Sequence, residues 1–351
     1  MPLRRAQVTD FRCLPSASLE FDPKFTLISG PNASGKTSVL EALYVLGRGR
    51  SFRTRRLEHL IRRGTDHFVV FGEVESAAGR VPVGVEGSAS GMRAKIAGQS
   101  PPSLADLALR LPVQIIDPEV HRLIEEGPSR RRRFLDWGVF HVEPEFVSQW
   151  QRYNQVLKQR NAALKSGDAG LVPPWDRELI LFGEQITAAR RRYLERLVGP
   201  AVTMARSLLG LELAVSYRAG WAKELSLAEA LAQSLEHDRD LGSTQVGPHR
   251  AELSLRLDGS AVRDRISRGQ QKLLAAALLM AQVKLFPEDA PVQPTLLLDD
   301  PAAELDDERL ARLIAEVSQQ PLQLIITTLH PDFAAFGAPG RRYQLKDGQL
   351  I

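Results

Sequence analysis

The sequence predicts an α/β protein in which a sheet is assembled from both ends of the chain and a mainly helical lobe is inserted between them. Three observations predict this fold. A short apolar stretch, Phe25–Ile28, leads through a glycine-containing turn into an apolar helical pattern. Strand and helix patterns alternate again after Gly247, and the stretch between these two parts carries apolar residues mainly at helical spacing.

The N-terminal part is predicted to contain strands around one buried helix. Phe25–Ile28 is a β-leaning run that ends at Gly30, as expected of a buried strand that feeds a loop. Residues 39–46 are apolar on most faces and are followed by Gly47, which predicts a buried helix with its C-cap. Residues 68–96 alternate apolar residues with glycine and polar ones, which is typical of an antiparallel meander.

The middle of the chain is predicted to be helical. Apolar residues recur at helical spacing from Phe146 to Leu157 and again from Leu179 to Leu197, where Gly199-Pro200 is expected to end the helix. The glycine- and proline-rich segment 166–174 separates the two helices as a hairpin would. Such stripes are usually bundle core, and the second helix spans too few heptads for a long coiled-coil arm.

The C-terminal part alternates again between strand and helix. Strands are predicted at residues 251–257, 296–298 and 324–327, and helices at 272–283 and 310–317, which favours a parallel sheet. We therefore expect an ATPase-like lobe from residues 1–117 and 245–351, and a helical lobe carrying a short antiparallel hairpin at residues 118–244.

Composition points to an ordinary globular protein. Of the 351 residues 43% are hydrophobic and 25% are charged, and no stretch approaches the ~20 uninterrupted apolar residues of a membrane span. The N-terminus lacks the apolar region of a secretory signal, and the single cysteine, Cys13, excludes an internal disulfide and a cysteine-based zinc site. We expect a soluble, cytoplasmic protein with no membrane partner.

The net charge is only +4, but arginine is clustered. Seven arginines lie between Arg48 and Arg63 against one acid, Glu58, and a second run occupies Arg130–Arg133. Such clusters favour a polyanionic partner, although charge runs are usually solvated faces. Because the first cluster directly follows the predicted nucleotide helix, we expect a DNA contact there, made by Arg48, Arg50, Arg53, Arg55 and Arg56.

The strongest motif is a P-loop. Residues 30–37, GPNASGKT, satisfy G-x-x-x-x-G-K-[ST] between a predicted strand and a predicted helix, where a chance match has a probability on the order of 1%. Its backbone amides would wrap phosphates, Lys36 would reach the β and γ phosphates, and the Thr37 hydroxyl would ligate Mg²⁺. The predicted ATP-binding residues are Gly30, Pro31, Asn32, Ala33, Ser34, Gly35, Lys36, Thr37 and Ser38.

An acidic strand end supplies the second half of this site. The apolar run 295–298 ends in Asp299-Asp300, which would deliver a carboxylate to a metal-bound water beside the P-loop. Asp299 would hold Mg²⁺, and Asp300 would position or deprotonate the attacking water. By itself this pattern is better explained as a strand followed by an acidic loop, but together with the P-loop the functional interpretation is favoured.

Three further features have both an ordinary and a functional explanation. Ser267-Arg268-Gly269-Gln270 opens an apolar helix, either as an N-cap or as a phosphate-binding helix start that serves another subunit. His330 follows an apolar strand and is either a loop residue or a sensor of the γ-phosphate. Gln114 is a loop glutamine by default and a contact to Mg²⁺ or water by hypothesis.

Together these motifs resemble ABC-type ATPases and, more narrowly, the RecF family of bacterial recombination mediators. The narrower resemblance extends from the first strand to the C-terminus. It rests on residues 130–141 (RRRRFLDWGVFH), 159–164 (QRNAAL), 247–250 (GPHR), 267–272 (SRGQQK) and 297–307 (LLDDPAAELDD).

The resemblance implies an ABC-type P-loop ATPase head, with a mixed sheet, an antiparallel β meander and an inserted helical lobe. It implies ATP and Mg²⁺ as cofactors, an ATP-dependent homodimer, and slow ATP hydrolysis that acts as a switch. It further implies binding to double-stranded DNA and single/double-strand junctions. RecO and RecR would be partners in loading RecA at gaps during replication-linked repair and the SOS response.

The resemblance also assigns residue roles. Gln114 would be the Q-loop residue, Ser267, Arg268, Gly269 and Gln270 the signature acting in trans, Glu304 and Asp306 the D-loop acids, and His330 the sensor. Arg268 stands where the general ABC signature has the first of two glycines. Asp300 stands where most ABC ATPases carry glutamate, and its shorter reach is consistent with slow turnover.

Three alternatives remain. The ATPase subunit of an ABC transporter is the main one, but such subunits usually keep the signature much closer to the P-loop. A small-molecule kinase would leave the Ser267–Gln270 element without a role. The head of an SMC-like complex is disfavoured by the missing long heptads.

Overall fold

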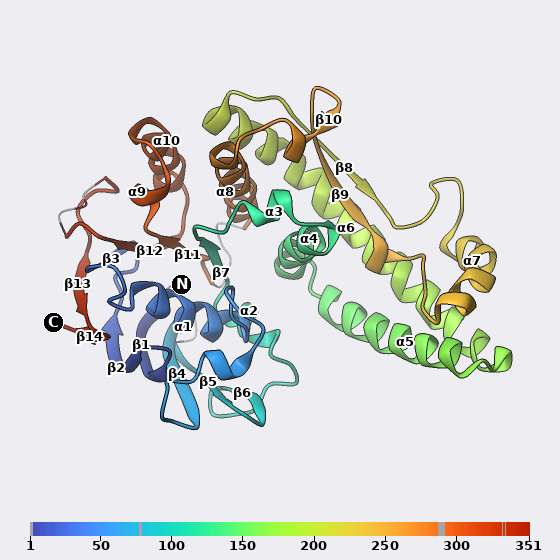
Figure 1. Ribbon diagram of the computed structural model, residues 1–351, viewed down its shortest axis with the longest axis horizontal. Helices are drawn as coiled ribbons and strands as arrows, with labels where there is room; N and C mark the ends of the chain where they lie inside the picture. Colours follow the sequence, from blue (N-terminus) through green and yellow to red (C-terminus); the bar gives the residue numbers. More distant parts are fainter. Residues whose placement is uncertain (1–2, 77–78, 287–291, 332, 334) are drawn as a thin grey trace. The chain divides into compact units, whose positions relative to one another are not determined.

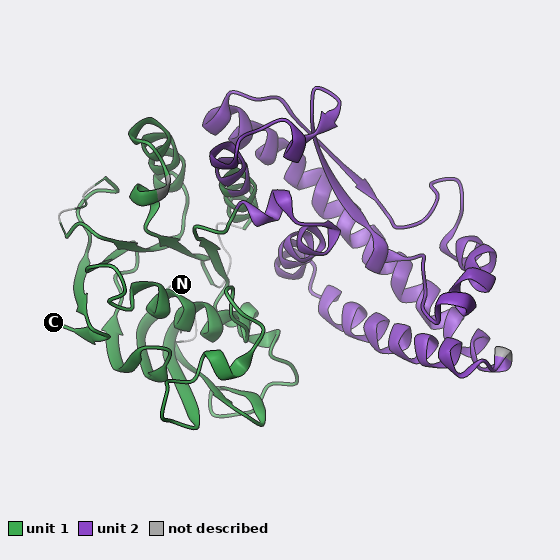
Figure 2. Ribbon diagram, viewed as in Figure 1, with its two compact units in different colours: residues 1–120, 276–351 green, residues 121–275 purple. Residues whose placement is uncertain are grey.

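The computed structural model describes residues 3–76, 79–286, 292–331, 333 and 335–351. It divides into two compact units, shown in Figure 2. Unit 1 consists of residues 1–120 and 276–351, and unit 2 of residues 121–275. Within the described ranges, no helix is both long enough and apolar enough to cross a membrane.

Unit 1 contains a six-stranded sheet with the order β14-β13-β3-β12-β11-β7, to which both ends of the chain contribute (Figure 1). β7, β11, β12, β3 and β13 pair in parallel, and β14 pairs antiparallel with β13. These strands are β3 (Phe25–Ser29), β7 (Val113–Ile116), β11 (Thr295–Asp299), β12 (Gln323–Thr328), β13 (Arg341–Lys346) and β14 (Gln349–Leu350). β3, β11 and β12 are buried along their whole length, as expected of central parallel strands.

A second, antiparallel sheet of unit 1 has the order β2-β1-β4-β5-β6. Its strands are β1 (Leu3–Phe11), β2 (Leu14–Glu20), β4 (His67–Ser76), β5 (Gly79–Ser88) and β6 (Gly91–Ile96). Helix α1 (Lys36–Arg48) contacts strands of both sheets and is buried on most faces. Unit 1 also contains η1 (Leu57–His59), α2 (Asp106–Arg110), α9 (Pro301–Glu304) and α10 (Asp307–Ser318). The predicted mixed sheet with an antiparallel meander is confirmed.

Unit 2 is mainly helical and carries one small sheet with the order β10-β9-β8 (Figure 1). Its helices are α3 (Arg122–Glu125), α4 (Pro128–Val142), α5 (Phe146–Ser166), η2 (Ala169–Leu171), α6 (Pro173–Leu209), α7 (Leu227–Leu241), η3 (Pro248–Arg250) and η4 (Val262–Asp264). Its strands are β8 (Leu213–Arg218), β9 (Glu252–Leu257) and β10 (Ser260–Ala261). Helix α8 (Arg268–Lys284) begins in unit 2 and continues into unit 1.

The second part of the ATPase-like lobe was predicted to begin at residue 245, but the second part of unit 1 begins at residue 276. Residues 245–275 belong to unit 2, whereas the sequence pattern assigned them to the ATPase-like lobe. The strand predicted at residues 251–257 does form as β9, but β9 pairs with β8 and β10 instead of joining the parallel sheet. A single strand pattern does not identify its partner strands, and this caused the error.

The predicted end of the second long helix at Gly199-Pro200 is also wrong, because α6 continues to Leu209. Proline inside a helix removes one backbone hydrogen bond and costs about 3 kcal/mol. The apolar stripe nevertheless continues past it, with Leu197, Ala201, Met204 and Leu208 all buried. We attribute the continuation to this burial, since a fully buried leucine or methionine side chain contributes about 1.5–3 kcal/mol.

Candidate nucleotide-binding site

The P-loop lies between β3 and α1, where the sequence placed it (Figure 1). Its two glycines have no room for a side chain. A Cβ on Gly30 would lie 2.2 Å from the Leu345 carbonyl oxygen, and Gly35 has a φ of +105° at the N-cap of α1. Glycine is therefore required at both positions, and the backbone amides stay accessible for phosphate oxygens.

Two side chains of the loop suit a phosphate ligand. Lys36 Nζ donates to the carbonyl oxygens of Gly30 (2.7 Å) and Pro31 (2.9 Å), so its charge lies inside the loop. Burial lowers the pKa of Lys36, and the nearby carboxylates Asp300 and Asp299 oppose that shift. The Ser34 hydroxyl is buried without a hydrogen-bond partner among the described residues. An anionic oxygen in the loop would satisfy both groups.

The predicted metal pair is assembled beside the P-loop. The Thr37 hydroxyl lies 2.9 Å and 3.1 Å from the two carboxylate oxygens of Asp299. Thr327 on β12 donates to Asp299 Oδ1 at 2.7 Å, and Asp299 is only 6% exposed. A hydroxyl, a carboxylate and phosphate oxygens form the ligand set that Mg²⁺ prefers in nucleotide sites.

Asp300 and His330 follow the neighbouring strands β11 and β12 at the same edge of the sheet. Asp300 adopts a left-handed conformation (φ 46°, ψ 58°), and its backbone N–H donates to Thr327. This conformation separates the direction of its side chain from that of Asp299, whose carboxylate is held by Thr37 and Thr327. His330 is exposed, and its N–H donates to the Thr328 hydroxyl.

Gln114 does not lie at a strand end, and its predicted place in a loop is wrong. It is the second residue of β7, its side chain is buried, and its amide donates to Gln282 at 2.9 Å. In the parallel ladder Gln114 pairs with Leu296, three residues before Asp299. At about 3.3 Å per residue this level lies roughly 10 Å from that of Asp299, so the structure does not bring Gln114 to the metal pair.

The same register identifies a residue that the sequence reasoning missed. Ile116 pairs with Leu298, so the next residue, Asp117, is level with Asp299 on the adjacent strand. Asp117 is partly buried. The signal was present in the sequence, because Asp117 ends an apolar strand as Asp299 does, but without the register the two acids could not be placed side by side.

The Ser267–Gln270 element begins α8 with a reciprocal cap. The Ser267 hydroxyl accepts from the Gln270 N–H at 3.3 Å, and the Gln270 side chain accepts from the Ser267 N–H at 2.9 Å. This is the ordinary N-cap arrangement, and it places the Ser267 hydroxyl and the amide of Gly269 at a helix N-terminus. The Arg268 guanidinium contacts Nε2 of the buried His121 at 2.9 Å and 3.1 Å.

The D-loop acids occupy a helix start. Asp306 is the N-cap of α10, where its side chain accepts from the Arg309 N–H at 2.9 Å and forms an ion pair with the Arg309 guanidinium at 3.0 Å. Glu304 ends α9, and its side chain lies outside the described parts of the structure. The geometry thus assigns only a capping role to Asp306 within one chain.

The segment from Arg50 to Arg63, which we call the basic loop, is anchored to α1. Glu41, one turn after Thr37 on α1, is fully buried and accepts both guanidinium bonds of Arg12 at 2.7 Å and 2.9 Å. Glu41 also forms an ion pair with Arg53 at 3.5 Å and accepts a hydrogen bond from Ser51. The loop is thereby connected to the helix that carries the P-loop lysine.

Not all of the predicted DNA contacts are available on this loop. Arg48 packs over the Tyr44 ring at 5.5 Å, and burial lowers its pKa to about 10, so its place is in the packing of α1. Arg50, Arg55 and Arg56 are exposed, and no carboxylate in the described part of the chain lies within ion-pair distance of them.

The chain is similar to known proteins over its whole length. The family model for the RecF/RecN/SMC N terminal domain matches residues 2–339. A protein of Pseudomonas syringae pv. tomato named DNA replication and repair protein RecF is 43% identical, covering 100% of this chain and 98% of its own. The protein of the same name from Escherichia coli O1:K1 is 39% identical over 94% of this chain and 93% of its own.

Solved structures are also similar to this chain over almost its whole length. The recombination mediator protein RecF bound to ATP, from the RecFOR pathway, matches with a TM-score of 0.89 and 29% identity, covering 99% of this chain and 96% of that chain. An SMC head bound to the C-winged helix domain of ScpA matches with a TM-score of 0.62 and 16% identity over 100% of this chain and 97% of that chain, which shows the fold alone. The transporter alternative is not favoured by any of these likenesses. With full-length identity above 40% to proteins named RecF, the chain belongs to the RecF family within the RecF/RecN/SMC group.

Proposed function

We propose that this chain is an ATP-dependent DNA-binding protein of recombinational repair and replication restart. The observation that carries the proposal is the assembled pair of P-loop and acidic strand end, in which Thr37 meets Asp299. The relatives supply the biological setting, since they are named for DNA replication and repair and one of the solved structures was determined with ATP.

ATP binding follows from the loop. The backbone amides of residues 30–38 other than Pro31 would surround the phosphates, and Lys36 would turn from the loop carbonyls to the β and γ oxygens. Mg²⁺, when bound, neutralises charge on the phosphate oxygens, and Thr37 and Asp299 would hold it. Asp300 would position or deprotonate the attacking water, and its short side chain suits slow turnover. The register of β7 against β11 makes Asp117, and not Gln114, level with Asp299. We therefore assign to Asp117 the contact to Mg²⁺ or water that was predicted for Gln114.

ATP would act as a switch through dimerisation. Lys36 already lies at one side of the phosphates, so the Ser267 hydroxyl and the Gly269 amide serve the γ-phosphate of a second copy. The pair of chains would then share two nucleotides, and hydrolysis would separate them. His330, exposed at the sheet edge next to β3, is a suitable sensor of the same phosphate.

DNA binding would depend in part on the basic loop. Arg50, Arg53, Arg55 and Arg56 face solvent on a segment tied to α1 through Glu41, so movement of α1 with the nucleotide reaches the loop directly. Arginines on phosphates confer affinity without sequence specificity. We expect double-stranded and gapped or junction DNA as ligands, and RecO and RecR as partners in loading RecA, as the RecFOR pathway of the relative suggests.

Sedimentation with and without ATP, in the presence of a gapped duplex, tests this proposal. The expected result is a dimer that forms only with ATP and binds the DNA. A protein that binds ATP but stays monomeric would contradict the switch, and an ATP-dependent dimer without DNA affinity would contradict the assignment to repair.

A further inference from the structure

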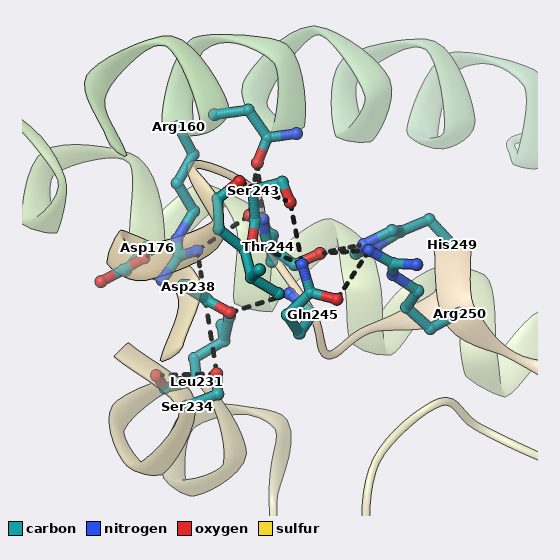
Figure 3. Close-up of polar contacts among 12 residues, drawn as sticks. Arg160, Asp176, Leu231, Ser234, Asp238, Ser243, Thr244, Gln245, His249 and Arg250 are labelled. Carbon is teal, nitrogen blue, oxygen red and sulfur yellow. Dashed lines mark hydrogen bonds and ion pairs between the residues drawn. The ribbon is translucent and has the colours of Figure 1, made fainter. Parts of the chain in front are cut away.

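A buried polar network in unit 2 fixes the segment between α7 and β9 (Figure 3). The Arg160 side chain is fully buried and donates to Asp176 (2.7 Å), Asp238 (2.7 Å) and Thr244 (2.8 Å). Asp238, also fully buried, accepts in addition from the Gln245 N–H at 2.9 Å. Removing one member would leave a buried charge without its partner, so the segment is held firmly.

His249 closes the other end of this segment. Its Nε2 lies 3.0 Å from the Thr244 carbonyl oxygen, so Nε2 must carry the proton, and Nδ1 accepts from the Tyr153 hydroxyl at 2.7 Å. Burial lowers the pKa of His249 to about 4, which agrees with a neutral ring. Gly247 has a φ of +129°, and a Cβ there would lie 2.7 Å from the Tyr153 hydroxyl. The conformation of residues 244–250 is thus tightly determined.

Three arginines are bound to this rigid segment through neutral oxygens. Arg190 donates to the Pro248 carbonyl (2.7 Å), Arg132 to the Ala251 carbonyl (2.7 Å), and Arg250 to the Gln245 side chain (2.9 Å). The segment therefore gathers positive charge from α4, α6 and η3 at one place.

The nearby carboxylates neutralise only part of this charge. Asp136 is engaged by Arg190 at 2.7 Å and 3.0 Å. Glu252 is engaged by Arg131 at 2.8 Å and 3.2 Å. Among the described residues, no carboxylate lies within ion-pair distance of Arg132 or Arg250.

Arg132 and Arg250 also act on each other. The pKa of Arg132 is lowered first by its partial burial and then by the charge of Arg190, and Arg250 acts in the same direction, whereas Glu252 and Asp136 oppose the shift. Arg250 is exposed. Each guanidinium has five N–H donors. Within the described residues the hydrogen bonds of each involve a single nitrogen, which in Arg132 donates to the Ala251 carbonyl and in Arg250 to the Gln245 side chain at 2.9 Å and the Thr244 carbonyl at 3.4 Å.

We propose that Arg132 and Arg250 form a site for the phosphate backbone of DNA on unit 2, in addition to the basic loop of unit 1. The proposal rests on the proposed function, which supplies a polyanion as the missing counter-charge. The forked donors of the two guanidiniums match phosphate oxygens, and their hydrogen bonds to the backbone and to Gln245 limit the side-chain entropy lost on binding. Such contacts would position DNA without reading its sequence.

The test is the salt dependence of binding between the full-length protein with ATP and a gapped duplex. Arg132→Gln and Arg250→Gln should each reduce the slope of log K against log salt by about 1, and the double variant by about 2. Arg250→Lys should retain the slope. Arg256→Gln is the matched control, because Arg256 is an exposed arginine of unit 2 that donates to the Gly259 carbonyl at 2.7 Å, and it should leave the slope unchanged.

Several outcomes would overturn the proposal. If Arg250→Gln and the double variant kept the wild-type slope, the proposed site at Arg132 and Arg250 would be contradicted and the proposed function would not. An equal loss in the Arg256→Gln control would reduce the effect to general charge. If the same variants also lost affinity for ATP in the absence of DNA, Arg132 and Arg250 would bind the phosphates of the nucleotide instead. A wild-type protein that binds no DNA would contradict the proposed function itself. If Arg132→Gln fails to fold, as judged by urea unfolding, Arg250→Gln decides the question alone.

Discussion

Acidification should destabilise unit 2 through His249. In the folded protein both ring nitrogens are used by a neutral imidazole, which donates to the Thr244 carbonyl and accepts from the Tyr153 hydroxyl. Burial lowers the pKa of His249 to about 4, whereas an unfolded histidine titrates near 6.5. The unfolded state therefore binds more protons between these two values. The contribution of His249 to stability is complete above pH 6.5 and is lost as the pH falls toward 4.

The separation of the two pKa values sets the size of the effect. Complete protonation would remove about 3 kcal/mol, and about 2 kcal/mol of this is already lost between pH 7 and pH 5. At a urea dependence of roughly 2 kcal/mol per molar, the unfolding midpoint should fall by about 1 M. This window lies above the ordinary pKa of most carboxyl groups, and any contribution of the other six histidines is common to the wild type and a variant that lacks only His249.

Tryptophan fluorescence measures this change in unit 2 alone. All four tryptophans of the chain, Trp137, Trp150, Trp175 and Trp221, lie in residues 121–275. His249→Gln is the control, since it removes the titrating group at the same position. The wild type should lose about 2 kcal/mol more than His249→Gln between pH 7 and pH 5. Equal losses in the two proteins would refute the reasoning.

Three further predictions concern unit 1. Asp300→Asn should lower ATP turnover by about 10²–10⁴-fold while ATP-dependent dimers persist in light scattering, because the base is removed but the phosphate contacts remain; loss of the dimer would contradict this role. Lys36→Arg should bind ATP but fail in single-turnover hydrolysis, since a planar fork cannot replace a point charge; normal hydrolysis would contradict it. Glu41→Gln should reduce the stability of unit 1 by about 2 kcal/mol in thermal unfolding and weaken DNA binding, because Arg12 and Arg53 lose a buried carboxylate. Unchanged thermal stability of Glu41→Gln would show that the contacts of Glu41 with Arg12 and Arg53 do not stabilise unit 1.

The nucleotide site was predictable because its signals are local. The P-loop needs a strand, two glycines and a helix start within thirteen residues, 25–37, and the sequence displays all of them in order. Asp299 was predictable for the same reason, as the end of a fully apolar strand. The P-loop pattern stands by itself, whereas the strand end at Asp299 was read as functional only together with the P-loop, because its contact with Thr37 joins residues 262 positions apart.

Gln114 and Asp117 show where local reasoning ends. The choice between them depends on the register of β7 against β11, two strands that are far apart in the chain. A shift of three residues moves a side chain by roughly 10 Å along the sheet. Motif matching placed the glutamine at the metal because glutamine is the expected residue type, and the ladder instead buries it against Gln282.

The two arginine clusters show the same limit of local reasoning for ion pairs. In sequence, Arg130–Arg133 is a uniform basic run, yet in the fold Arg131 forms an ion pair with Glu252, more than a hundred residues later. Arg132 donates to a carbonyl oxygen and forms no ion pair with the described residues. In the first cluster Arg53 is likewise partly neutralised by the buried Glu41, while its neighbour Arg55 is not. Whether an arginine is available for a phosphate thus depends on whether the tertiary structure places an acidic side chain beside it. An unpaired guanidinium on a rigid backbone, such as that of Arg250, is therefore a better indicator of a polyanion site than the density of arginine in the sequence.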